Sequence, residues 1–462
     1  MLGWHPFESE PSNGLRFNRT PLHDPYQANM KVVFLTAGAA GMYCGSCMHD
    51  NATARVLQAS GIDCILQPIY TPIRTDEPSI AQEQIFFGGI HIYLLQQLPW
   101  TRFFPKSIRR LLDWPPLIQM ATRRAMSTDA AKLGALAISM LKGTEGRQAE
   151  EVQRLTTWLE SEMQPDVLVL SNLLIGGALP TIRQRLPNTK IVVLLQGDDI
   201  FLDHLPAEAR AQAIELCAKL VDSVDQFIVN SRFYADKMGS LLSIPERKLT
   251  TIPLSIDLHP FAPRESSTEN VERIRLGYLA RIAPEKGLHR LVDAFIELAH
   301  QPPHANLTLE VAGWLGEANR PYLDSIQQRI DKANLRHRFT YHGSPSLDEK
   351  SQFLRSLDLL CVPTEYEDPK GLFALEAIAS GVPVVLPDHG AFGELIASTA
   401  GGVLVPANDH HALSDGIGRL ARDHELRHHL ARTGRINVQQ THSIETTAER
   451  LVLLFNELTS TA

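Results

Sequence analysis

Two series of short apolar runs, each run followed by a segment long enough to form a helix, constrain the fold of this chain more than any other feature. The first series comprises Val32–Leu35, Asp166–Leu170, Ile191–Leu195 and Phe227–Val229, and the second comprises Ile274–Leu279, Leu307–Ala312, Leu357–Val362 and Val382–Leu386. Alternation of β-branched runs with amphipathic segments predicts parallel strands whose sheet is covered by helices on both faces. Since there are two series, the sequence predicts an α/β protein with two doubly wound, Rossmann-like domains.

A polar stretch that contains two prolines, residues 258–270, separates the two series and has the composition of a linker. We therefore predict an N-terminal, acceptor-binding domain over residues 30–258, with a helical insertion around 72–150, and a C-terminal domain over 271–440. Residues 441–462 are expected to form a helix that packs back toward the N-terminal domain. Residues 1–29 are predicted to be disordered, with Met30 as a candidate start of translation.

The composition excludes several classes of protein. Of the 462 residues, 44% are hydrophobic and 21% are charged, and no apolar run approaches the roughly 18 residues that would span a bilayer. The first 29 residues do not have the pattern of a secretory signal, so we expect a cytoplasmic protein. A net charge of −8 argues against nucleic acid as a general partner. Five cysteines, an odd number, suit a reducing compartment better than a disulfide framework.

Candidate ligand-binding residues follow the predicted strands. Open parallel sheets bind ligands outside the carboxyl ends of their strands, so two facing sheets predict a cleft between those ends. Arg281 and Lys286 follow the run Ile274–Leu279. A forked guanidinium and a compact ammonium at the end of a strand suit a diphosphate. The alternative is a pair of solvated surface charges.

A second group of residues favours a diphosphate site over a pair of solvated surface charges. After a buried strand that ends near Pro363, a loop with Asp368 leads into a helix that begins at about Gly371. Free amides at the start of this helix, those of Gly371, Leu372 and Phe373, predict an anion site that the helix dipole strengthens. Glu376 lies one turn further on, where its carboxylate can accept hydrogen bonds from a ribose diol. Asp368 is placed to reach the hydroxyls of a bound sugar.

These motifs resemble the retaining glycosyltransferases of family 4, which have the GT-B fold. The similarity comprises Arg281, then Lys286-Gly287, then an acid, seven residues and Glu376 before Ala-x-Ala-x-Gly-Val-Pro-Val-Val. The resemblance covers nearly all of the C-terminal half and, more weakly, residues 31–257. It implies transfer of a sugar from a UDP- or GDP-type nucleoside diphosphate sugar to a hydroxyl acceptor, with retained anomeric configuration and no metal or cofactor. It also implies residue roles.

In that family the diphosphate ligands correspond to Arg281 and Lys286, the ribose ligand to Glu376 and the donor-sugar contact to Asp368. The family usually has Glu where this chain has Asp368, which is one methylene shorter. Many members have His where this chain has Gln196, which can still offer a hydrogen bond but no titratable imidazole. Gln196 and Asp199 are therefore candidate contacts for the sugar or the acceptor.

The loop after the first strand, residues 38–51, carries three glycines and the sequence Cys44-Gly45-Ser46-Cys47. In the family this loop approaches the donor phosphates and the acceptor, and Gly38 and Gly41 would allow close backbone approach. A Cys-x-x-Cys at the start of a helix also suggests a thiol oxidoreductase, or a metal site completed by His49. The alternative is packing of small residues around a ligand loop.

Residues 99–126 combine four aromatic residues with six basic residues and one acid. Such a segment suggests peripheral contact with an anionic membrane, at its inner face, or recognition of a lipid-linked acceptor. The alternative is a helical insertion packed on the acceptor side. On the whole sequence we expect an enzyme, a retaining glycosyltransferase with a sugar, lipid-linked or small-molecule acceptor. A sugar-nucleotide epimerase and a non-catalytic binder are alternatives on the same fold.

Overall fold

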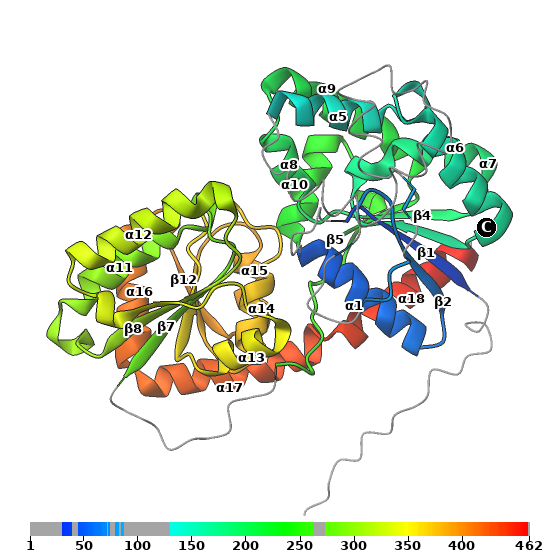
Figure 1. Ribbon diagram of the computed structural model, residues 1–462. Helices are drawn as coiled ribbons and strands as arrows, with labels where there is room; N and C mark the ends of the chain where they lie inside the picture. The colour runs from blue at the N-terminus through cyan, green and yellow to red at the C-terminus, as the bar shows by residue number, and fades with distance from the viewer. Residues whose placement is uncertain are drawn as a thin grey trace, which may run out of the picture.

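The computed structural model describes residues 30–38, 45–71, 73, 79–82, 85–86, 130–261 and 273–460. These residues form two α/β units that lie beside each other (Figure 1). Residues 1–29 and 99–126, on which the start of translation and the membrane hypothesis depended, lie outside the described residues. Among the helices that are described, none is long and apolar enough to cross a membrane.

The N-terminal unit contains a six-stranded sheet in the order β2-β1-β3-β4-β5-β6, and every neighbouring pair is parallel. Its strands are β1 (Lys31–Thr36), β2 (Asp63–Pro68), β3 (Val167–Leu170), β4 (Lys190–Leu194), β5 (Gln226–Val229) and β6 (Leu249–Thr251). In β1, the central residues are buried on both faces, which explains its uninterrupted run of apolar side chains. This sheet confirms the predicted α/β class for the N-terminal half.

Helices cover both faces of this sheet. One face packs against α5 (Ala130–Leu141), α6 (Ala149–Trp158), α7 (Leu179–Arg185), α9 (Ala207–Leu220) and α10 (Arg232–Leu242). The other face packs against α1 (Gly45–Ala59) and α18 (Ile444–Ser460), the last helix of the chain. A short helix, α8 (Asp198–Asp203), follows β4.

The C-terminal unit repeats this architecture with the strand order β12-β11-β10-β7-β8-β9, again all parallel. Its strands are β7 (Ile274–Leu279), β8 (Leu307–Ala312), β9 (Phe339–Tyr341), β10 (Leu359–Cys361), β11 (Val384–Pro387) and β12 (Gly402–Val405). From β7 the chain builds toward β9, and from β10 it builds the other way toward β12. The neighbours β7 and β10 therefore form the topological switch point, where open α/β sheets bind ligands.

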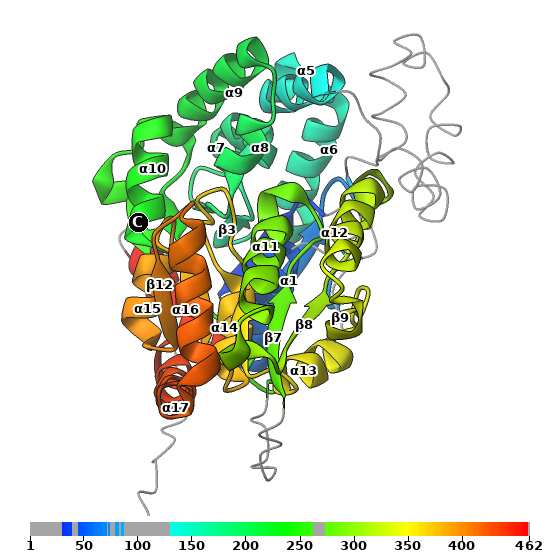
Figure 2. The same cartoon turned by 90° about the vertical axis from the view of Figure 1, so that its left-hand side faces the viewer.

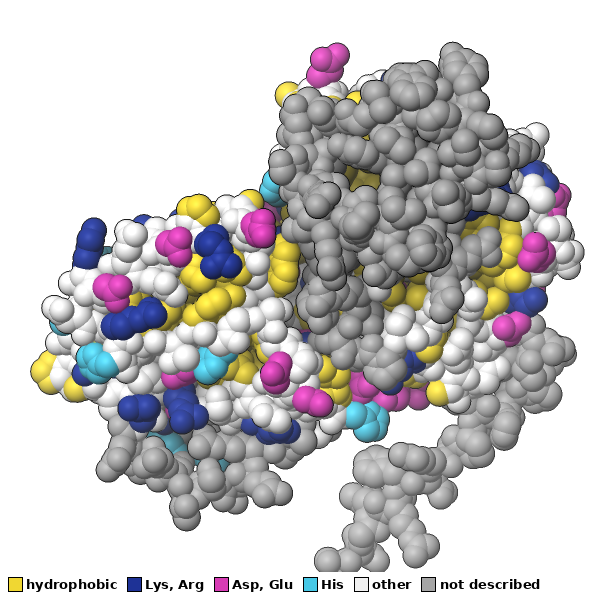
Figure 3. All heavy atoms as spheres, viewed as in Figure 1, with side chains coloured by type: hydrophobic (Ala, Val, Ile, Leu, Met, Phe, Trp, Pro, Cys, Tyr) yellow, Lys and Arg dark blue, Asp and Glu magenta, His cyan; other side chains and the backbone are white. Residues whose placement is uncertain are grey.

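The helices of the C-terminal unit lie on both faces of its sheet (Figure 2). They are α11 (Leu288–Ala299), α12 (Arg320–Lys332), α13 (Leu347–Arg355), α14 (Leu372–Ala379), α15 (Phe392–Thr399), α16 (His410–Arg422) and α17 (His424–Thr441). On the visible face of this unit, basic and acidic side chains are interspersed rather than gathered by sign (Figure 3).

The chain passes between the units twice, and the two passages are hydrogen-bonded to each other. The amide of Ile256 donates to the carbonyl of His442 at 3.0 Å, and the amide of Ile444 donates to the carbonyl of Ile256 at 2.9 Å. The buried ring of His442 contacts the carbonyl oxygen of Leu254 at 2.7 Å and the hydroxyl of Ser398 at 2.9 Å. This double crossing carries the chain from α17 back to α18 on the N-terminal unit.

Candidate functional site

The turn after β7 is fixed against the loop that follows β10. The hydroxyl of Tyr278 donates to the carbonyls of Arg281 (3.2 Å) and Lys286 (3.4 Å), so a buried tyrosine holds both ends of the turn. Gly287 has φ +74°, and a Cβ placed there would lie 1.8 Å from the carbonyl oxygen of Pro363. A residue without a side chain is therefore required here, because the turn packs directly on the neighbouring loop.

Lys286 and Asp368, which are far apart in the sequence, form a buried ion pair at the switch point. The Nζ atom of Lys286 lies 3.0 Å from Oδ2 of Asp368, and the side chains are 12% and 8% exposed. The hydroxyl of Tyr366 donates to the same oxygen at 3.1 Å and also bonds the ammonium of Lys286. Burial, followed by the charge of Asp368, raises the pKa of Tyr366, so its hydroxyl remains a donor.

The second oxygen of Asp368 shapes the loop. Oδ1 accepts hydrogen bonds from the amides of Lys370 and Gly371, both at 3.0 Å. Burial by itself would raise the pKa of Asp368, but the charge of Lys286 and these hydrogen bonds outweigh it and lower the pKa to about 2. Both oxygens are thus engaged by the protein, where the sequence predicted a contact with the donor sugar. The amide of Gly371, which was predicted to be free, is engaged as well.

Of the three amides that were predicted to be free at the start of α14, two have no acceptor among the described residues. Gly371 precedes the helix with φ +73°, and the amides of Leu372 and Phe373 have no acceptor among the described residues. The ring of Phe373 packs edge-on against Phe392 at 5.9 Å and lies 6.0 Å from Nζ of Lys286. The structure therefore places two free amides and one ammonium around the positive end of a helix dipole.

Arg281 occupies the rim rather than this buried cluster. Its side chain is 47% exposed, and its Nη2 atom lies 3.5 Å from Oε1 of Glu285 on the same turn. An exposed pair of this kind contributes little to stability. Arg281 thus remains available to a ligand at the mouth of the site.

Glu376 lies inside α14 and is almost wholly buried. Its Oε1 atom accepts a hydrogen bond at 2.7 Å from Nζ of Lys350, on α13, and the two side chains are 8% and 10% exposed. Lys350 could not be identified from the sequence, since a lysine in a polar helical segment gives no signal of burial.

Across from this site, Gln196 connects the two units. Its Nε2 donates to Asp50 Oδ1 at 2.9 Å, and its Oε1 accepts at 2.9 Å from Nζ of Lys370. Asp50 is fully buried and also accepts from the hydroxyl of Thr36 at 3.1 Å. Lys370 donates in addition to the hydroxyl of Ser46, near the start of α1, at 2.7 Å. The predicted candidate Gln196 is therefore buried between the two units, where it is held by a lysine of the loop that follows Asp368.

Asp199, the other candidate contact for the sugar or the acceptor, is bound by two side chains of its own unit. Its carboxylate accepts from the hydroxyl of Tyr234 at 2.7 Å and pairs with Nζ of Lys237 at 2.9 Å. Both carboxylate oxygens of this buried side chain are therefore engaged by other residues of the protein. Beside it, burial raises the pKa of Asp198 to about 6, although the amides of Leu173 and Gln196 oppose the shift.

Part of the glycine-rich loop is described. Gly38 has φ +81°, and a Cβ there would lie 1.9 Å from the carbonyl of Thr71, so its close approach is to the segment after β2. Gly41 and Cys44 lie outside the described residues. Cys47 is buried, and its Sγ atom lies 3.9 Å from the hydroxyl of Thr36. Within the described ranges, no group of three or more His, Cys, Asp or Glu side chains is placed to hold a metal ion.

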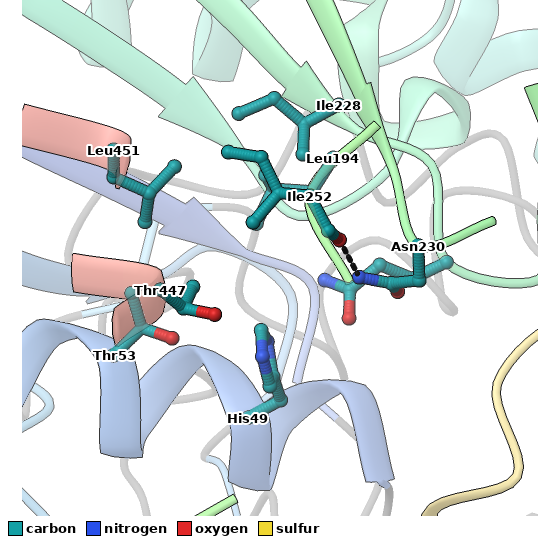
Figure 4. A pocket seen from close by; sticks show the side chains of 9 residues that line it. His49, Thr53, Leu194, Ile228, Asn230, Ile252, Thr447 and Leu451 are labelled. Atoms are coloured by element: carbon teal, nitrogen blue, oxygen red, sulfur yellow. Dashed lines mark hydrogen bonds between the residues drawn. The ribbon is translucent and has the colours of Figure 1, made fainter. Parts of the chain in front are cut away.

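His49, on α1, lines two small pockets. Figure 4 shows its ring in one of them, beside Thr53 and Thr447, with Asn230 bonded to the carbonyl of Ile252 at 3.1 Å. Both ring nitrogens are buried and have no partner in the described part of the chain. Burial, and then the charge of Lys370, lowers the pKa of His49 to about 3. The imidazole is therefore neutral at physiological pH.

Two doubly wound units that face each other across such a site define the GT-B fold. The chain resembles solved structures of this fold over nearly its whole length. Sucrose-phosphate synthase from Thermosynechococcus elongatus superposes with a TM-score of 0.68 at 18% identity, covering 94% of this chain and 100% of that one. HepE from Anabaena, solved with UDP, superposes with a TM-score of 0.64 at 15% identity, covering 93% and 100%.

The family described as Glycosyl transferases group 1 matches residues 262–437, so the C-terminal unit carries a domain of that family. Among curated proteins, the mannosyltransferase LpcC of lipopolysaccharide core biosynthesis from Rhizobium leguminosarum is 29% identical over 245 residues, 52% of this chain and 66% of that protein. The D-inositol 3-phosphate glycosyltransferase of Corynebacterium urealyticum is 24% identical over 55% of this chain and 61% of that protein. The matched part thus spans less than two thirds of these relatives.

Proposed function

We propose that this chain is a retaining glycosyltransferase of family 4, which moves a sugar from a nucleoside diphosphate sugar to a hydroxyl acceptor without a metal ion. The observation that carries the proposal is the convergence of three groups at the switch point: the ammonium of Lys286, the free amides of Leu372 and Phe373, and the buried carboxylate of Glu376. The first two suit a diphosphate and the third suits a ribose diol.

The relatives support this proposal. The curated proteins named above transfer mannose or act on inositol phosphate, and HepE was solved with UDP. A sugar nucleotide as donor and a sugar, lipid-linked or other small-molecule hydroxyl as acceptor are therefore our proposal for this chain. We also propose domain bounds of 30–258 and 271–440 and a cytoplasmic location, with peripheral membrane contact through residues 99–126.

In the proposed reaction, the protein acts by electrostatics. Lys286 and the amides of Leu372 and Phe373 stabilise the charge that develops on the leaving diphosphate as the glycosidic bond lengthens, and Arg281 adds a guanidinium from the rim. The proton of the acceptor hydroxyl passes to an oxygen of the donor phosphate, so no protein nucleophile or general base is required. The new bond then forms on the face from which the diphosphate departs, which retains the configuration.

Closure of the cleft is proposed to exclude water during transfer. Two residues that flank Asp368 reach the N-terminal unit: Glu367 pairs with Lys237 at 3.1 Å, and Lys370 bonds Gln196 and Ser46. The loop that surrounds Asp368 therefore also holds the two units together. Acceptor binding in the N-terminal unit and donor binding in the C-terminal unit are linked through this loop.

The experiment that tests the function is turnover with UDP- and GDP-sugars against a mixed panel of hydroxyl acceptors. Proton NMR of the product should show the anomeric configuration of the donor, and exhaustive chelation should leave the rate unchanged. An inverted product, or a dependence on Mn²⁺ that survives chelation controls, would contradict the proposed mechanism. Binding of a sugar nucleotide without transfer to any acceptor would favour a non-catalytic binder, and isomerisation of the donor would favour an epimerase.

A further inference from the structure

The ion pair of Lys350 and Glu376 differs from the surface pairs of this protein. Its atoms are 2.7 Å apart, and the two side chains are 10% and 8% exposed. Taking two charges out of water is unfavourable, and an apolar pair of similar volume is often as stable or more stable. A buried pair is therefore weak evidence for a contribution to stability, which points to a role for the charges themselves.

The pair lines a pocket between the two units. Lys350 and Glu376 form its C-terminal side, while His49 of α1 and Ser255 of the first interdomain passage lie on the opposite side. The ring nitrogens of His49 and the hydroxyl of Ser255 are buried and have no partner among the described residues. Unsatisfied polar atoms beside a buried carboxylate suit a ligand that carries hydroxyl groups.

We propose that Lys350 is a positioning residue for donor binding: its ammonium bonds Oε1 of Glu376 and so orients the carboxylate toward the ribose diol of a nucleoside diphosphate. The inference rests on the proposed function. It adds to the proposed donor site a residue that influences the preference for ribose over deoxyribose through its contact with Glu376.

Three charged or titratable groups face Glu376 in this pocket, and Lys350 alone of these supplies a positive charge. His49 is neutral because burial and Lys370 lower its pKa to about 3. Asp257 brings a negative charge, which is directed to Arg55 at 3.8 Å and to His259 at 2.9 Å. Without Lys350, Glu376 would be a buried carboxylate with no cation in its pocket, and such a group takes up a proton at a higher pH.

The test is titration calorimetry of the full chain with UDP and GDP and with their 2′-deoxy analogues. The wild type should prefer the ribonucleotide by about 10- to 100-fold, the effect of one hydrogen bond to a charged group. Lys350→Met should reduce this preference to within about twofold, while Lys350→Arg should retain most of it. Lys248→Met is the matched control, because this half-buried ammonium donates to the carbonyls of Val221 and Val224 in the N-terminal unit.

Two further measurements separate a positioning role from a structural one. Binding of UDP or GDP to Lys350→Met should weaken as the pH falls from about 8 to about 6, whereas binding to the wild type should not. If Lys350→Met does not fold, Lys350→Gln, which removes the charge but keeps a hydrogen-bond donor and leaves Glu376 in place, replaces it and should show the same loss of ribose preference.

A folded Lys350→Met that retains the full ribose preference would overturn the inference. A wild type that binds a nucleoside diphosphate without ribose preference would also overturn it but would leave the proposed function standing. A wild type that binds neither UDP nor GDP would contradict both the inference and the proposed function.

Discussion

Asp368 acts as a link between two parts of the site. Its two oxygens connect the ammonium of Lys286 with the amides of Lys370 and Gly371. Its shorter side chain, which the sequence analysis regarded as a departure from the family, suits this role because the carboxylate lies within reach of its own loop. The protein thus sets the position of Lys286 before any ligand binds.

We expect Asp368→Asn to reduce the free energy of unfolding by about 3 kcal/mol, because the substitution leaves the buried ammonium of Lys286 without its anion. The new amide nitrogen would also face the amides of the loop. Urea unfolding at pH 7 measures the change. The control is Glu215→Gln, which breaks an exposed pair with Lys219 in which both side chains are 66% exposed, and should leave the stability almost unchanged.

His49 predicts a specific dependence of stability on pH. Its pKa is about 3 in the folded protein and about 6.5 when unfolded, so only the unfolded chain takes up the proton between these values. The stability that the neutral ring of His49 contributes is fully present above pH 6.5 and is lost as the pH falls toward 3. At pH 5 the loss from this residue is about 2 kcal/mol.

His49→Gln should therefore lose about 2 kcal/mol less than the wild type between pH 7 and pH 5. Urea unfolding at the two pH values measures the difference. The exposed His337 provides the control, since His337→Gln should follow the wild type. Equal losses in wild type and His49→Gln would show that the buried ring is protonated in the folded state.

The sequence predicted the elements on which the candidate residues lie better than it predicted the contacts of those residues. Lys286 lies in the turn after β7, Asp368 lies in the loop after β10, and Glu376 lies in the helix that this loop enters. Their partners could not be predicted. Lys350 comes from another helix, and the hydrogen bonds of Asp368 and Asp199 depend on how loops pack in three dimensions. Whether the predicted residues bind the donor remains a prediction.

At the level of elements, the strands that the sequence revealed are the central ones. The four that no predicted run includes, β2, β6, β9 and β12, are the four edge strands of the two sheets. Two of these, β6 and β9, have only three residues each. An edge strand has one neighbour and is less buried, so it does not need a continuous apolar run. Burial on both faces is what made the central strands visible.

The first turn of α10 is capped from the other unit. Glu394, on α15, accepts hydrogen bonds from the amides of Arg232 and Phe233 at 2.8 and 2.7 Å, while Ser231 supplies the local cap. A carboxylate at a helix N-terminus contributes about 1 kcal/mol. Here that free energy favours the arrangement of the two units in this structure, since the amides that donate and the carboxylate that accepts belong to different units.

Glu394→Ala should consequently open the cleft rather than unfold the protein. We expect a larger radius of gyration by small-angle X-ray scattering and, in the proposed reaction, a several-fold higher KM for the acceptor, with a fall in stability of about 1 kcal/mol. Asp409→Ala removes a comparable cap, that of α16, within the C-terminal unit and should leave the radius unchanged. Identical scattering from the two variants would contradict a role of Glu394 in closure.

At the scale of the whole molecule, the N-terminal unit depends on the far end of the sequence. The ring of Phe455, on α18, is fully buried with Val32 and Phe34 of β1 and Leu57 of α1. We expect Phe455→Ala to reduce the free energy of unfolding by about 3–5 kcal/mol through loss of apolar burial and the cavity that remains. Leu453→Ala, on the same helix at a position that is 68% exposed, should be nearly neutral. Denaturant unfolding followed by far-UV circular dichroism compares the two.

The return of α18 to the first sheet also sets the order in which the protein can be completed on the ribosome. The strands of the N-terminal unit are synthesised first, yet one face of their sheet lacks part of its cover until residues 444–460 have emerged. The C-terminal unit must by then have been translated entirely. The nascent N-terminal unit therefore exposes apolar surface until α18 has been synthesised. We expect the chain to bind chaperones most strongly during this interval.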